Sequence, residues 1–139
     1  MKIKLICDSL CDIPQEIQNK EYLDVVPLTI MFNDKEYKDG VDISKEQYYE
    51  ILKGSKEIPK TSQATYIQFN DIFNKYIDEG YKIICINGSS KSSGTYQSAM
   101  LAKNDMGEKA NDILNQIKQK IKEYDESFYA VIKAEYSFV

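Results

Sequence analysis

The chain has 139 residues and a formal net charge of -4 at pH 7. This length suits one compact domain, and the acidic balance argues against a nucleic-acid partner, because phosphate binding normally draws on a clustered Lys or Arg face. The chain contains neither His nor Arg, which excludes Ser-His-Asp and Cys-His catalysis and bidentate guanidinium recognition of anions within it.

The three cysteines, Cys7, Cys11 and Cys85, lie in apolar surroundings, and the first two lack the CxxC spacing of redox and zinc motifs. We therefore expect reduced, structural thiols, no metal and no cofactor. The apolar run at the start is too short for a signal peptide, and no stretch approaches the roughly twenty residues of a membrane span. A cytoplasmic location is the expectation.

The first third of the chain alternates strand and turn signals. Residues 3–7 predict a buried strand, and the stretch Asp12-Ile13-Pro14-Gln15 predicts a short helix to about residue 20 with Asp12 as its N-cap. Residues 24–31 predict a second strand, in which Pro27 indicates an edge or a bulge. A tight turn is expected at residues 33–34.

Two amphipathic helices are predicted next. Ser44-Lys45-Glu46-Gln47 is a capping box that opens a helix through Leu52, with Gly54 as its C′ residue. A second helix, ended by Gly80, places its apolar side chains on one face: Tyr66, Phe69, Phe73, Tyr76 and Ile77. A buried strand over 81–86 and a helix over 96–102 follow, and this alternation predicts a parallel α/β sheet.

A hydroxyl-rich loop, Ser89-Ser90-Lys91-Ser92-Ser93-Gly94-Thr95, separates that last strand from the last of these helices. Unpaired N–H groups and the helix dipole at such a position favour a carboxylate or a phosphate. A second loop of similar chemistry, Thr61-Ser62-Gln63-Ala64-Thr65, also precedes a helix. The two loops suggest one anion site beyond the carboxyl ends of the strands.

At this point the sequence resembles the DegV family, bacterial proteins that bind a fatty acid and present it to a fatty acid kinase. The resemblance covers residues 3–102 and rests on the order and spacing of several short motifs. These are Asp8-Ser9, Asp12 with Pro14, Val26-Pro27-Leu28, Tyr37 with Asp39-Gly40 and Asp42-Ile43, Thr61-Ser62-Gln63, Ser89-Ser90, and Ser93-Gly94-Thr95-Tyr96-Gln97-Ser98-Ala99.

The resemblance implies an α/β fold with a parallel-sheet, Rossmann-like three-layer domain over residues 1–106. It also implies that Thr61 and Ser93 hydrogen-bond the fatty acid carboxylate. Ser62, Gly94 and Thr95 complete the expected carboxylate-binding set, with Gly94 allowing close backbone approach. For Thr61 and Ser62, the alternative is simple capping of the following helix.

Four further residues are expected to support the site. Asp8 and Ser9 either take part or form a strand-end turn that braces the loops; a carboxylate beside a bound carboxylate would repel it, so Asp8 is expected to orient groups without touching the ligand. Ser89 belongs to the hydroxyl-rich loop. Lys91 is either a solvated charge on the loop or a positive charge that attracts an anionic head group.

Two departures from the family pattern stand out. Ser92 and Ala64 replace the apolar residue and the Pro that relatives usually carry. The resemblance implies a second, helical domain in full family members, which supplies a His near the head group, and we expect it to be absent or truncated here. Residues 107–139 predict an amphipathic helix and an alternating strand, packed on the same domain as a remnant of that second domain or a divergent end of the first.

We therefore expect a carrier that is not an enzyme, with a long-chain fatty acid as ligand and a fatty acid kinase as partner. A first-domain wall without its second domain also predicts exposed apolar surface or self-association. One alternative is a small serine-dependent hydrolase or an enzyme that binds a phosphoryl ligand through the same loop, although no base for Ser93 is visible. Another is a truncated interaction module that binds no lipid.

Overall fold

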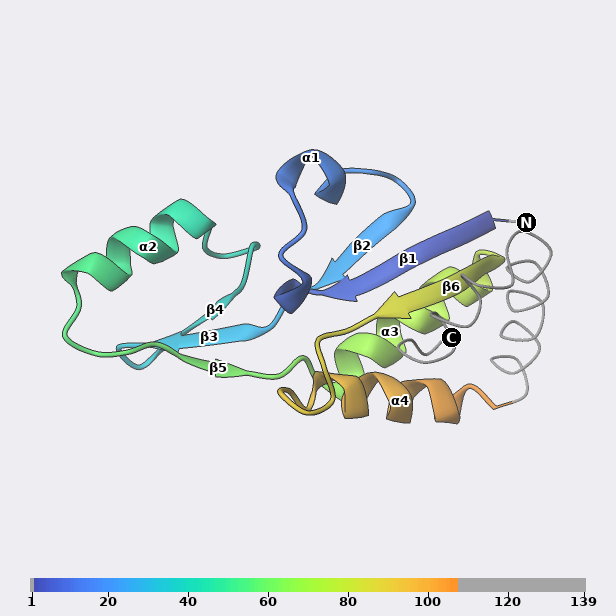
Figure 1. Ribbon diagram of the computed structural model, residues 1–139. Coiled ribbons are helices and arrows are strands. Elements are labelled where there is room, and N and C mark those ends of the chain that lie inside the picture. The colour runs from blue at the N-terminus through green and yellow to red at the C-terminus, as the bar shows by residue number, and fades with distance from the viewer. Residues whose placement is uncertain (1, 108–139) are drawn as a thin grey trace.

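A three-stranded parallel sheet carries the fold in the computed structural model, which describes residues 2–107 (Figure 1). Its strands are β1 (Lys2–Asp8), β2 (Leu23–Val26) and β6 (Tyr81–Ile86), in the order β2-β1-β6. The register pairs Ile6 with Cys85 and Cys7 with both Val25 and Ile86. The predicted α/β class with a parallel sheet is confirmed.

The chain leaves β1 toward β2 on one side and returns through β6 on the other. The carboxyl ends of β1 and β6 therefore form a topological switch point, where open α/β sheets leave room for a ligand. A short 3-10 helix, η1 (Ser9–Cys11), follows β1 at this point and leads into α1 (Gln15–Gln18). Both loops that follow β1 and β6 meet there.

The predicted N-cap of the first helix is wrong. Asp12 ends η1 in the left-handed conformation, with φ 49°, and Pro14 is the N-cap of α1 without a side-chain cap hydrogen bond. Asp12 was a candidate because it precedes Pro14, but a residue with positive φ cannot adopt the extended backbone that an N-cap needs. The helix is correspondingly short.

The predicted single strand over 24–31 is also wrong, because Pro27 divides it. Residues before Pro27 form β2 of the parallel sheet, and residues after it form β3 (Thr29–Phe32) of a second, antiparallel sheet. This sheet has the order β4-β3-β5, with β4 (Lys35–Lys38) and β5 (Lys60–Ser62). The tight turn between β3 and β4 is confirmed, since Asn33 and Asp34 both have positive φ.

Helix α2 (Lys45–Gly54) lies with the antiparallel sheet, and Figure 1 shows this lobe at the left, apart from the parallel sheet. Its predicted capping box is confirmed: the Ser44 hydroxyl accepts from the Gln47 N–H, and the Gln47 side chain accepts from the Ser44 N–H. Gly54 is not the C′ residue, because it is the last residue of the helix itself and Ser55 is the C-cap.

The main hydrophobic core lies between the parallel sheet and α3 (Tyr66–Asp78). Phe69 and Phe73 have no exposed surface and Tyr76 is buried, which confirms the apolar face predicted for this helix. Gly80, with φ 79°, ends the segment. Helix α4 (Thr95–Asp105) adds small buried side chains, Ala99 and Ala102, to the same core.

No helix in the described part of the chain is long and apolar enough to cross a membrane. The helix and strand predicted within 107–139 lie outside the described residues, apart from Gly107, which follows α4 with φ 60°.

Candidate functional site

Asp8 holds together the two chain segments that leave β1 and β6. Its carboxylate is completely buried. One oxygen, Oδ1, accepts from the Leu10 N–H at 2.9 Å. The other, Oδ2, accepts from the Gly88 N–H at 2.8 Å and from the Asn87 side-chain amide at 3.1 Å. Asp8 therefore fixes the start of the hydroxyl-rich loop, and its oxygens face donors of the protein itself.

The turn after Asp8 also fixes neighbouring backbone. The Ser9 hydroxyl accepts from the Leu28 N–H at 3.1 Å, which ties η1 to the segment between the two sheets. The Leu10 side chain lies over Gly88, where an added Cβ would stand 2.7 Å from the Leu10 Cδ1. A side chain at 88 would displace the Leu10 side chain, so packing, and not the backbone angle, favours glycine there.

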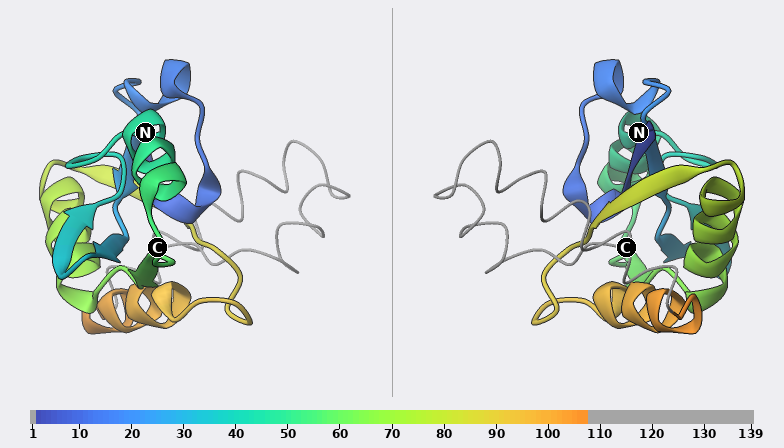
Figure 2. Two further views of the ribbon diagram at one scale, coloured as in Figure 1. Left: turned by 90° about the vertical axis from the view of Figure 1, so that its left-hand side faces the viewer. Right: turned by 90° about the vertical axis from the view of Figure 1, so that its right-hand side faces the viewer.

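The hydroxyl-rich loop projects from the molecule between β6 and α4 (Figure 2). The Ser89 carbonyl accepts from the N–H groups of Ser92 and Ser93, and the Ser89 hydroxyl accepts from the Lys91 N–H. Ser89 therefore closes the turn. Lys91 is exposed, whereas Ser93 is half-buried.

Thr95 and Gln63 join this loop to the segment before α3. The completely buried Thr95 hydroxyl accepts from the Ala64 N–H at 3.2 Å. The Gln63 side-chain amide donates to the Ser98 hydroxyl at 3.2 Å, across the start of α4. Gly94 lies against Gln63 so closely that an added Cβ would be 1.7 Å from its Oε1. The hydroxyl-rich loop and residues 63–64 of the second predicted loop therefore meet at the amino end of α4.

Ser93 and Thr95 form a hydroxyl pair at that helix end. The Ser93 hydroxyl accepts from the Thr95 N–H at 3.2 Å and lies 3.0 Å from the Thr95 hydroxyl. Either hydroxyl can supply the proton of this second contact, so the Ser93 proton is able to turn toward an acceptor outside the chain. The N-cap residue Gly94 makes no side-chain cap hydrogen bond, unlike Ser44 before α2 and Thr65 before α3.

Thr61 and Ser62 are not in a loop, contrary to the expectation. Both belong to β5, where Thr61 pairs with Ile30 and Ser62 with Thr29, and both are exposed. Nor do they cap α3, since Thr65 does so in a capping box with Gln68. This capping box was not predicted, although Thr65 and Gln68 have the spacing that is typical of one.

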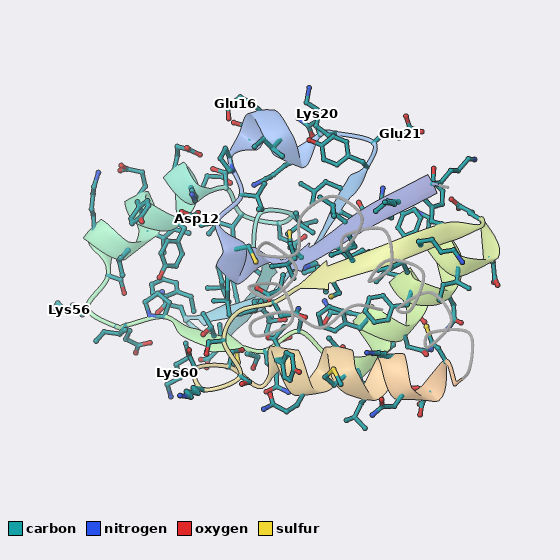
Figure 3. All side chains as sticks on the ribbon, turned by 45° about the vertical axis from the view of Figure 1, so that its right-hand side comes forward. Asp12, Glu16, Lys20, Glu21, Lys56 and Lys60 are labelled. Carbon is teal, nitrogen blue, oxygen red and sulfur yellow. The ribbon has the colours of Figure 1, made fainter. Side chains whose placement is uncertain are left out.

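Two surface hollows lie away from the hydroxyl pair. One, of about 440 Å³, lies between the β3–β4 hairpin and the segment before β5, and Ile58 and Lys60 line it. The other, of about 280 Å³, lies between α1 and the start of α2, and Ser9 lines it. An ion pair between Asp12 and Lys45 spans the second hollow, and Figure 3 shows Asp12 between η1 and α2.

The described residues contain no group of three or more His, Cys, Asp or Glu side chains that could hold a metal ion. What the site offers is an arrangement of neutral donors at the amino end of a helix. Such an arrangement suits an anion with oxygen acceptors, a carboxylate or a phosphate.

Comparison with known proteins places this arrangement in a family. The model of the DegV family, described as uncharacterised proteins, matches residues 2–130. A DegV domain-containing protein of Clostridium acetobutylicum is 52% identical over 102 residues, which are 73% of this chain and 37% of that protein. The chain therefore spans less than half the length of this relative.

Solved structures are similar over the same region. A stearic-acid-binding protein from Eubacterium ventriosum is 34% identical with a TM-score of 0.67, over 73% of this chain and 36% of that one. A DegV family protein from Thermus thermophilus, described as binding fatty acid, is 25% identical with a TM-score of 0.69, over 96% of this chain and 52% of that one. The parallel sheet, the loops at its carboxyl edge and these matches lead to one conclusion: the chain belongs to the DegV family.

Proposed function

We propose that this chain binds a long-chain fatty acid through its carboxylate and presents it to a fatty acid kinase, without itself catalysing a reaction. The head group would be held by Thr61, Ser62, Ser93, Gly94 and Thr95, supported by Asp8, Ser9, Ser89 and Lys91. Because such a kinase uses ATP, we propose that the protein acts in the cytoplasm. Residues 1–106 would form the domain that carries the head-group site.

The observation that carries the proposal is the hydroxyl pair of Ser93 and Thr95 at the start of α4. Gly94 brings the backbone of this helix end close to Gln63 and adds no side chain there. A carboxylate at this place would accept a hydrogen bond from the Ser93 hydroxyl and would meet the positive end of the helix dipole. Two structural relatives described as fatty-acid-binding proteins support a carboxylate over other anions.

Chemistry at Ser93 is not favoured by its surroundings. Both hydrogen bonds of its side chain go to Thr95, a neutral residue that cannot act as the base an acyl-transfer serine requires. Both oxygens of the Asp8 carboxylate accept hydrogen bonds from Leu10, Asn87 and Gly88, so Asp8 is engaged within the protein and does not serve as that base. Binding without turnover is the function that this geometry supports.

The acyl chain would supply most of the affinity. A sixteen-carbon fatty acid has about fourteen methylenes, so burying its chain contributes a gross of about 11 kcal/mol at about 0.8 kcal/mol per methylene, whereas each charge-assisted hydrogen bond adds about 1.5–3 kcal/mol. Since the chain spans 37% of its Clostridium relative, we propose that full acyl burial needs apolar surface beyond residues 2–107.

Native mass spectrometry of the purified protein tests the proposal first, and we expect an added mass of acyl size. Titration with a labelled long-chain fatty acid then tests the site. Ser93→Ala and Thr61→Ala should each weaken binding by about tenfold to a hundredfold, which corresponds to the loss of one charge-assisted hydrogen bond.

The matched control is Ser90→Ala, which removes an exposed hydroxyl from the same loop. It should bind as the parent does, and all three variants should keep the parent's thermal midpoint within a few degrees. A parent that binds no fatty acid overturns the proposed function, and equal binding by parent and Ser93→Ala overturns the site.

A further inference from the structure

The two faces of the parallel sheet differ in burial. Side chains alternate along a strand, and residues paired in register point to the same face. One face carries Ile6 and Ile83, which have no exposed surface and belong to the main core cluster with α3 and α4. On the other face Leu5 pairs with Ile84, and both are only half-buried, while Ile3 is 38% exposed. The second face is therefore apolar without being fully covered.

The connections between the strands explain this difference. Strand β2 lies on one side of β1 and β6 on the other, so right-handed crossovers place the two connections on opposite faces of the sheet. The connection from β2 to β6 contains α3, which covers the first face. The connection from β1 to β2 contains only η1 and the four-residue α1, and neither buries any of its residues. Within residues 2–107, the second face thus lacks a long helix.

The open part of the second face lies toward β6. Next to β2, Leu23 and Cys7 are buried, whereas Ile84 and Ile86 on β6 are half-buried. Lys82, which pairs with Ile3 near the amino end of β6, is also half-buried, and its aliphatic stem can lie along apolar neighbours. Parallel sheets occur almost only where both faces are covered. This face therefore needs an apolar partner.

The sequence after α4 has the chemistry of such a partner. Residues 110–124 place apolar side chains at helical spacing, with polar and charged side chains between them. At about 1.5 Å per residue, a helix over this range would be about 22 Å long. The seven residues of β1 span about 23 Å, which matches that length. The apolar residues of the segment are Ala110, Ile113, Leu114, Ile117, Ile121 and Tyr124.

The direction of α4 brings the chain to the right end of the sheet. This helix starts beyond the carboxyl end of β6 and runs back alongside that edge strand toward the amino ends of the strands (Figure 1). Gly107 follows with φ 60°, a conformation that ends a helix and turns the chain. The next residues therefore start at the end of the sheet where Ile3 lies. Being tethered there, they have a higher effective concentration at this face than a separate partner has.

We propose that residues 110–124 pack as an amphipathic helix on the second face of the parallel sheet, defined by Ile3, Leu5, Ile84 and Ile86. This packing would give the sheet its second helical layer and is independent of fatty acid binding. It would also join β1 to β6 from the side opposite the main core. Because these strands lead into Asp8 and Gly88, the helix would stabilise the sheet that carries the candidate site.

Methyl NMR on the full chain with labelled isoleucines tests the placement directly. Methyl groups of Ile84 or Ile86 should show NOE contacts to methyl groups of the 110–124 segment, and Ile83, on the first face, should show none. Light scattering should give the mass of a monomer. The absence of these contacts overturns the proposal. Contacts seen only between differently labelled copies in a mixed sample would assign the face to a second copy and overturn it as well.

A double-mutant cycle tests the same contact through stability. Ile84→Ala and Ile117→Ala should each lower the urea midpoint, and together they should lower it by less than the sum of the two separate shifts, because both remove the same packing. Gln119→Ala is the matched control, since Gln119 lies on the opposite side of the same predicted helix. Its shift should add to that of Ile84→Ala. Additive shifts for the Ile84 and Ile117 pair would contradict the proposed packing.

Discussion

At the residue scale, the candidate site depends on a buried charge that touches no other charge. A carboxylate can remain buried only when several donors replace the water that it loses. Asp8 meets this condition with two backbone N–H groups and the Asn87 amide. Its negative charge is thereby used to position loops and is kept from the place where we expect a bound carboxylate.

Replacing Asp8 with Asn tests this role. The amide would turn an NH₂ group toward either the Leu10 N–H or the Gly88 N–H, so one donor would face another. We expect a loss of about 1–3 kcal/mol in the free energy of unfolding. Urea denaturation measures it.

The same chemical change at Asp34 is the control. Asp34 is exposed in the β3–β4 turn with φ 59°, a conformation that Asn adopts readily, and Asp34→Asn should change stability by less than about 0.5 kcal/mol. If the two variants unfold at the same urea concentration, Asp8 does not hold the loops as described.

Gly94 offers a second test at this scale, because its backbone is unstrained and only space requires glycine there. Its φ of -73° suits any residue, but an added Cβ would strike the Gln63 side chain. Gly94→Ala should therefore displace the exposed end of Gln63 from Ser98, lower stability by at most about 1 kcal/mol through the lost hydrogen bond, and weaken fatty acid binding.

The clash should be relieved by a second substitution. In the double variant Gly94→Ala/Gln63→Ala, most of the stability lost to the single change should return, and a double-mutant cycle on thermal unfolding measures the coupling. Gly54→Ala is the matched control, since nothing lies within 4 Å of its added Cβ. It sits in the last turn of α2 and should stabilise by up to about 1 kcal/mol. An additive cycle would show that Gln63 is not the obstacle.

At the scale of elements, two helices with the same kind of cap differ in what they bury. Both α2 and α3 begin with a capping box. Helix α3 buries Phe69, Phe73 and Tyr76, whereas α2 buries none of its residues. Removing the N-cap hydroxyl should therefore change the free energy of global unfolding by different amounts in the two helices.

Thr65→Ala should lower the free energy of global unfolding by about 1 kcal/mol, because the core cannot form without α3. Ser44→Ala should leave global unfolding nearly unchanged and should speed hydrogen exchange within α2 alone, because α2 can fray while the core stays intact. Denaturant unfolding and amide exchange on both variants check this pair. Equal global effects would mean that α2 is as tightly coupled to the core as α3.

Elements with strong hydrophobic periodicity could be predicted from the sequence. Elements whose boundaries depend on a single residue could not. The face of α3 repeats five apolar residues, so its prediction was secure. Pro27 indicated an edge or a bulge within one strand, yet β2 ends at Val26 just before it, and the chain then begins a strand of another sheet. Because Pro27 lacks an N–H, it is compatible both with a bulge inside a strand and with the end of a strand. Only the pairing partners of β3 distinguish the two.

The same limit applies to the candidate site. The hydroxyl-rich sequence predicted Ser93 and Thr95 as site residues, and both lie at the start of α4 in the structure. Gln63 was not singled out, because its bond to Ser98 spans 35 positions of sequence. The strand pairing of Thr61 and Ser62 was hidden for a similar reason, since β5 has only three residues and no alternating pattern.

At the scale of the whole molecule, the described chain contains two sheets, and buried apolar residues of the antiparallel lobe lie outside the main cluster. The main cluster includes Ile6, Ile83 and Phe69. Ile30, Phe32 and Ile43 are buried in the antiparallel lobe but do not belong to that cluster. At the boundary between the two sheets, the Ser9 hydroxyl accepts from the Leu28 N–H and the Gln68 side-chain amide donates to the Pro27 carbonyl.

We therefore expect the antiparallel lobe to open locally while the parallel sheet stays folded. We expect the amides of β4 and α2 to exchange through local opening at a free energy well below that of global unfolding, while β1 and β6 exchange only when the whole domain unfolds. Native-state hydrogen exchange at increasing denaturant measures both sets. The Gln68→Ala variant would sharpen the test, since losing its bond to the Pro27 carbonyl should lower the lobe's opening energy by about 1 kcal/mol, whereas losing that bond together with the capping box of α3 should lower the energy for β1 by more. If β4, α2, β1 and β6 instead exchange at one common free energy, the two sheets form a single cooperative unit, and the lobe beside the candidate site cannot move independently of the core.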